Sequence, residues 1–85
     1  SDLEGSEKAL SEAYSALWAK VPADNRKGLA DSQREWLRYR KAHCRWEAGA
    51  GFPMGNTITS SAFVACVADL NRERAAYLKQ DMTRW

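Results

Sequence analysis

The stretch DSQREWLRYRKAHCRW, residues 31–46, decides the fold. Polar and aromatic side chains recur in it at steps of three or four residues, which is the spacing of one helix face. These positions are Gln33, Trp36, Leu37, Arg40 and Cys44, and the same period extends back to Leu29. The pattern predicts a helix over residues 25–47, and Asp24 is a suitable N-cap for it.

A second and a third helix are predicted on either side of this one. Residues 6–20 form the first, and Val21–Pro22 ends it because proline cannot continue a helix interior. The last covers residues 57–82. The positions that define these two faces are Leu10, Tyr14, Leu17, Trp18 and Val21 for the first, and Phe63, Cys66, Val67, Leu70, Arg74, Tyr77 and Leu78 for the last.

Between the second and third predicted helices lies AGAGFPMGN, residues 48–56. Such a concentration of glycine and proline marks a loop. No segment shows the alternating pattern of a strand. The sequence therefore predicts an all-α protein, a small three-helix bundle with short connections that forms a single domain over residues 1–85.

Composition narrows the class of protein. A chain of 85 residues makes one small domain that buries only about 60% of its unfolded surface, so a covalent staple would help it. Its net charge of +2 is too small to require a polyanionic partner. No apolar run is long enough to span a membrane. The sequence begins at Ser1 rather than Met, so we expect a mature or trimmed fragment.

The two cysteines, Cys44 and Cys66, allow two interpretations. They would be free thiols in the cytosol and a disulfide in an oxidising compartment. The small size of the chain favours the disulfide, because a bridge closing a loop of about twenty residues would contribute roughly 3 kcal/mol. Together with the single histidine, His43, they are too few for a zinc site, and no C-x-x-C motif occurs. We expect no metal and no cofactor.

Two arginines and a glutamine are predicted to lie on inward helix faces. We expect Gln33, Trp36, Arg40 and Arg74 to form a structural polar core, because a buried guanidinium must be paired. The expected partner of Arg40 is either a carboxylate, from Glu7, Glu12 or Asp69, or the carbonyl groups at a helix end. The less favoured alternative is that Arg40 lines a binding pocket.

A basic stripe occupies the outward face of the second predicted helix. It consists of Arg34, Arg38, Lys41 and Arg45. The stripe is either a solvated face, diluted by Glu35 and Glu47, or an electrostatic contact surface for phosphate or another acidic group. The nearly neutral net charge and the absence of helix-turn-helix spacing argue against nucleic acid.

No catalytic constellation is recognisable. General acid–base chemistry needs a positioned histidine or paired carboxylates, and His43 stands alone. We therefore predict a protein that is not an enzyme. Phe52 and Met54 lie on the glycine-rich loop, where they either form a protein-binding tip or, in the case of Phe52, fold back on the bundle.

Three segments resemble the bacterial LprI-type lysozyme inhibitor family. They are LSEAYSAL (10–17), SQREWLRYRKAHC (32–44) and CVADLNRERAAYL (66–78), with a glycine-rich loop between the last two as in the family. The resemblance implies a helical fold, a disulfide between Cys44 and Cys66, and export to the bacterial envelope. Lys41 departs from the aspartate usual in the family and Ser11 from the usual asparagine.

The same resemblance implies a protein partner, and lysozyme inhibition is known for a few members. We expect Phe52 and Met54 to form an apolar collar around the lysozyme cleft, and Lys41 or Arg45 to supply charge to its two carboxylates. The expected location is periplasmic or secreted, as part of an envelope lipoprotein. The alternative is a general envelope interaction module or a toxin-immunity-like module that does not inhibit lysozyme.

Overall fold

The computed structural model describes residues 2–49 and 60–85. Three α-helices, α1 (Leu3–Lys20), α2 (Arg26–Gly49) and α3 (Ser60–Asp81), form the fold. Two single 3₁₀ turns, η1 (Ala23–Asn25) and η2 (Met82–Arg84), precede α2 and follow α3. No strand occurs in these two ranges. The predicted all-α three-helix architecture is confirmed.

The helix ends differ from the predicted ones by a few residues. The first turn of α1 starts at Leu3, because the backbone N–H of Ser6 bonds to the carbonyl of Asp2 at 2.9 Å. Asp24 is not the N-cap of α2, since it lies inside η1. Residues 48 and 49 belong to α2 rather than to a loop, and Ala48 buries its side chain.

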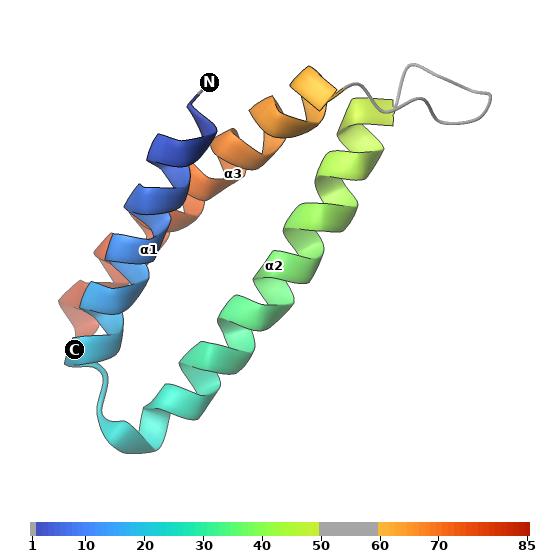
Figure 1. The fold of residues 1–85 in the computed structure, drawn as a ribbon. Coiled ribbons are helices and arrows are strands. Elements are labelled where there is room, and N and C mark those ends of the chain that lie inside the picture. Colours follow the sequence, from blue (N-terminus) through green and yellow to red (C-terminus); the bar gives the residue numbers. More distant parts are fainter. Residues whose placement is uncertain (1, 50–59) are drawn as a thin grey trace.

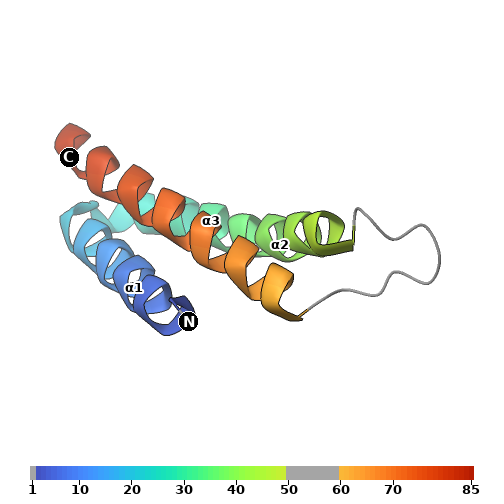
Figure 2. The same cartoon turned by 90° about the horizontal axis from the view of Figure 1, so that it is seen from above.

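Helices α1 and α3 form the packed part of the molecule. They run in the same direction and lie side by side, with α2 running the opposite way (Figures 1 and 2). Their contact is a core of small and branched apolar side chains: Leu10, Ala13, Leu17, Val21, Ala75 and Leu78. Burial of such surface, at about 25 cal/mol per Å², is the main stabilising term of a chain this size.

Helix α2 is attached differently. It diverges from α1 beyond the turn that joins them (Figure 1), and α3 crosses it obliquely (Figure 2). Of its 24 residues, only Cys44 and Ala48 are buried. A disulfide joins Cys44 to Cys66 of α3 across a Cα–Cα distance of 5.5 Å, which confirms the bridge. Leu29 and Trp36 of α2 pack half-buried against the α1–α3 core, and covalent and polar links supply the rest of its attachment.

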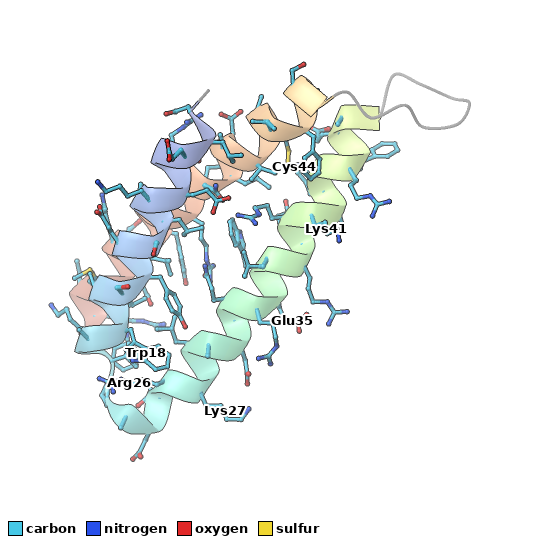
Figure 3. The ribbon with its side chains drawn as sticks, viewed as in Figure 1. Trp18, Arg26, Lys27, Glu35, Lys41 and Cys44 are labelled. Atoms are coloured by element: carbon cyan, nitrogen blue, oxygen red, sulfur yellow. A yellow bond between two sulfur atoms is a disulfide. The ribbon has the colours of Figure 1, made fainter. Side chains whose placement is uncertain are left out.

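The start of α2 is fixed to the end of α1 by Arg26. Its Nε donates hydrogen bonds to the carbonyl oxygens of Trp18 at 3.2 Å and Val21 at 3.1 Å. The guanidinium also lies 5.4 Å from the centre of the Trp18 ring, and the two side chains meet below α1 in Figure 3. A cation that bonds the last carbonyls of a helix satisfies acceptors left over there and favours its dipole.

Candidate functional site

Three helices are joined by a chain of hydrogen bonds centred on Asn71. Arg40 on α2 donates from Nη1 to Asn71 Oδ1 at 2.7 Å. Asn71 on α3 donates from Nδ2 to Ser6 Oγ at 3.1 Å, and Ser6 on α1 donates to the carbonyl of Leu3 at 2.9 Å. Asn71 is fully buried and Ser6 almost so. Because every member has a partner, this buried polar group is compatible with a stable core.

Arg40 therefore has a neutral main partner that the sequence analysis did not name. Of the three carboxylates expected to pair with it, Glu7 comes within 4.0 Å, at the edge of an ion pair, and Asp69 pairs with Arg72 instead. A signal for Asn71 was present in the sequence. It follows Val67 by four residues and precedes Ala75 by four, so it occupies a polar position in an apolar helix face.

Arg74 forms the second link between α2 and α3. Its Nε donates to Gln33 Oε1 at 3.1 Å and its Nη2 to Ser32 Oγ at 3.2 Å. The guanidinium groups of Arg40 and Arg74 lie 5.5 and 5.6 Å from the centre of the Trp36 ring, within cation–π range. The structure thus brings these four residues together: the guanidinium groups of Arg40 and Arg74 lie at the Trp36 indole, and Gln33 bonds to Arg74.

The outward basic stripe divides into two halves with different electrostatics. Arg34 bonds Asp31 at 2.6 Å and Arg38 lies 3.6 Å from Glu35, so carboxylates three residues earlier offset this half. Hydrogen bonds from Lys27 and Arg34 hold the pKa of Asp31 below its ordinary value. In the remaining half, Lys41 and Arg45 are exposed and form no ion pair with any residue in 2–49 or 60–85.

Lys41 lies beside a cavity of about 320 Å³ where α2 faces the beginnings of α1 and α3. Its walls are mainly apolar and include Leu37, Phe63 and Val67. Arg40 and Lys41 contribute two cations and Glu7 one carboxylate. Figure 3 shows Lys41 on the same half of α2 as the bridging Cys44. The arrangement can hold an apolar side chain of a partner with a carboxylate next to it.

An aromatic ridge with two exposed members, Tyr39 and Trp46, runs along another flank of α2. It consists of Tyr39, His43 and Trp46, at positions i, i+4 and i+7. The rings of Tyr39 and His43 stack with centres 5.3 Å apart, and Trp46 is 68% exposed. The helical spacing of these three residues is visible in the sequence.

The remaining predicted contact residues, Phe52 and Met54, lie outside the described residues. Within ranges 2–49 and 60–85, no three histidine, cysteine, aspartate or glutamate side chains are grouped so as to hold a metal ion. None of the helices described is long and apolar enough to cross a membrane.

The fold is that of a small helical bundle closed by one disulfide. The chain belongs to the lysozyme inhibitor LprI family, whose model matches residues 1–78 and so includes the Asn71 and Arg74 links and the disulfide. This is an inhibitor family and not an enzyme family. Neither the curated proteins nor the solved structures contain a match to the chain.

Proposed function

We propose that this chain is an extracytoplasmic protein that binds a lysozyme and blocks its cleft, and that it has no catalytic activity of its own. The family match over residues 1–78 supports the partner. The disulfide supports the location, because such bonds persist in the periplasm and outside the cell. Both observations support periplasmic or secreted placement, with or without a lipoprotein anchor.

The main support for the binding site is that Lys41 and Arg45 make no ion pair with any residue in the described part of the chain. A glycosidase such as lysozyme works with two carboxyl groups flanking the scissile bond. A flexible lysine or arginine that reaches into such a cleft forms charge-assisted hydrogen bonds with them. Unlike Arg34 and Arg38, these two cations need not break an ion pair first.

The cavity beside Lys41 supports the same site. Leu37 is 40% exposed at its wall and provides an apolar surround for the charged contact. Exclusion of water around a central charged group is typical of the energetically dominant part of an interface. Phe52 and Met54 belong to this proposal as further apolar contacts, on the strength of their place in the sequence alone.

The test is inhibition by the oxidised protein of lysis of bacterial cell walls by c-, g- and i-type lysozymes, together with a binding isotherm. The double variant Lys41→Ala/Arg45→Ala is compared with Arg34→Ala/Arg38→Ala, which removes the same charge from the partnered half of the stripe. We expect the first pair to weaken inhibition by about tenfold or more and the second by less than about threefold.

Equal effects of the two double variants would contradict the site while leaving the function intact. If the wild-type protein neither binds nor inhibits any of the three lysozyme types, the proposed function itself is contradicted. The alternative of an envelope interaction or immunity-like module would then stand, and proteins captured from periplasmic extract would be the next measurement.

A further inference from the structure

A second cavity of about 320 Å³ lies between the first turns of α2 and the last turns of α3. It shares no lining residue with the cavity beside Lys41. Its polar lining includes Arg74 and Arg84, and its aromatic lining Tyr77 and Trp85. The volume is at the lower end of the range of small-molecule sites.

Arg74 is an unusual cation within this cavity. Both of its hydrogen-bond partners, Gln33 Oε1 and Ser32 Oγ, are neutral, and it makes no ion pair with a carboxylate of the residues described. Burial lowers the pKa of the Arg74 guanidinium, while the charges of Tyr77 and Asp81 act in the opposite direction. The group has therefore given up part of its hydration without gaining a paired anion.

The acidic side chain in the lining is already engaged. Asp81 Oδ1 pairs with Arg84 Nε at 2.7 Å, and the side chain of Asp81 is only 14% exposed. The lining side chains thus include two guanidinium groups and one carboxylate. Arg74 is the guanidinium that has no carboxylate partner among the described residues, and its Nη1 has no hydrogen-bond partner among them.

Two flat aromatic side chains provide part of the remaining surface. The Arg74 guanidinium lies 5.3 Å from the centre of the Tyr77 ring, and that of Arg84 lies 5.2 Å from the centre of the Trp85 ring. Tyr77 is 52% exposed and Trp85 39%. Exposed aromatic faces stack on planar groups and on the apolar faces of sugar rings, whereas a guanidinium fork matches a carboxylate.

We propose that this cavity binds a small organic carboxylate with a flat or apolar body, and that Arg74 holds its anionic group. The carboxylate supplies the charged partner that Arg74 lacks within the fold, and Tyr77 and Trp85 contact the body of the ligand. Such a ligand is either the carboxyl end of a peptide or an acidic sugar. The site is independent of the surface assigned to lysozyme.

Gly28 offers a way to block the cavity without disturbing the fold. It lines the cavity from the second residue after the start of α2, and a Cβ atom placed there would meet nothing within 4 Å. A side chain can therefore start at this position without a clash at Cβ, and we expect a phenylalanine ring there to occupy space at the cavity wall. Arg72 is the matched control for Arg74, because it lies on the same helix, is not part of the cavity and pairs with Asp2 and Asp69.

The experiment is a titration monitored by chemical shifts of the backbone and arginine N–H groups of the oxidised chain. Two probe pairs differ in the carboxylate: N-acetylphenylalanine with its amide, and N-acetylmuramic acid with N-acetylglucosamine. We expect at least one acid to bind about tenfold more tightly than its neutral counterpart. The acid that binds identifies the source, peptide or sugar.

Both Arg74→Gln and Gly28→Phe should weaken that binding by about tenfold or more, and Arg72→Gln by less than about twofold. If Arg74→Gln does not fold, Gly28→Phe alone decides. The proposal is overturned if neither acid binds, if acid and neutral probes bind equally, or if Gly28→Phe leaves binding unchanged. Lysozyme inhibition by Gly28→Phe should equal that of the wild type, which separates this site from the proposed function.

Discussion

The α1–α3 pair and helix α2 illustrate two ways of holding a helix in a small protein. Six buried apolar side chains close the α1–α3 contact: Leu10, Ala13, Leu17, Val21, Ala75 and Leu78. Helix α2 buries only Cys44 and Ala48 and is held by a disulfide and by hydrogen bonds from three arginines. Apolar packing spreads its free energy over many contacts, whereas each link of α2 is a single group.

The difference has a consequence for function. A helix fixed by a few discrete bonds leaves most of its surface available. Helix α2 carries the exposed Trp46 and the cations Lys41 and Arg45, which make no ion pair within residues 2–49 and 60–85. Helices α1 and α3 each give one apolar face to their mutual contact.

Replacement of Leu17 by alanine should cause the largest loss. Leu17 is fully buried in the α1–α3 contact, and deleting its side chain removes transfer free energy and leaves a cavity, a cost of about 2–5 kcal/mol. Urea unfolding of the oxidised chain measures it. The matched control is Leu37→Ala on α2, where the leucine is 40% exposed and the loss should stay below about 1 kcal/mol. Equal losses would contradict this difference between the helices.

Removal of the disulfide should rank next. The bond spans a sequence separation of 22 residues, for which loop-closure entropy gives about 3 kcal/mol. We expect Cys44→Ala/Cys66→Ala to lose amide protection first along α2, while α1 and α3 keep theirs. Hydrogen exchange resolved by residue makes the comparison. Loss of protection at the same rate in all three helices would show that α2 is not separately held.

Alanine at Asn71 tests the hydrogen-bonded chain between the three helices. The substitution removes the acceptor of Arg40 Nη1 and the donor to Ser6 Oγ, while Ser6 keeps its bond to the Leu3 carbonyl and Arg40 its contact with Glu7. We expect the loss of these two hydrogen bonds to cost about 1–3 kcal/mol. Thermal unfolding gives the change. Gln80→Ala, an exposed polar side chain on the same helix, should change stability by less than about 0.5 kcal/mol. An Asn71 variant as stable as this control would rule the link out as a stabilising element.

The smallest effect is expected at Asp31, on the exposed face of α2. Its pKa is lowered in the folded protein by Lys27 and Arg34, so its contribution is present above the unfolded pKa of about 3.9 and disappears as pH falls through the folded value. Asp31→Asn should therefore be slightly less stable than wild type at pH 7 and indistinguishable at about pH 2. Melting curves at both pH values test the sign, and a gap that widens in acid would contradict it.

The helices were predictable because their signals are local. The period of Gln33, Trp36, Arg40 and Cys44 and the break at Pro22 each act within a few residues, and α2 forms where they indicate. The neutralisation of the Arg34 and Arg38 charges was also predictable from the sequence, since Asp31 and Glu35 precede these arginines by three residues.

The tertiary parts of the candidate site were not predictable in the same way. Asn71 and Ser6 are 65 residues apart, and only the packing of α1 on α3 brings them to 3.1 Å. The sequence alone suggested a carboxylate or helix-end carbonyls as the partner of Arg40, whereas its hydrogen-bond acceptor is the side-chain amide of Asn71. The cavity around Arg74 likewise depends on the distance between α2 and the end of α3. The residue spacing within either helix does not determine that distance.

The disulfide also determines the covalent topology of this chain. Any single backbone cut between Gly49 and Ser60 falls inside the loop closed by Cys44 and Cys66, so the two fragments remain one molecule until a reductant is added. Helices α2 and α3 are thus joined by two independent covalent routes, one through the backbone and one through sulfur. A protease that cleaves this connection outside the cytoplasm would change the electrophoretic pattern under reducing conditions only, and the mass of the intact particle by a single water.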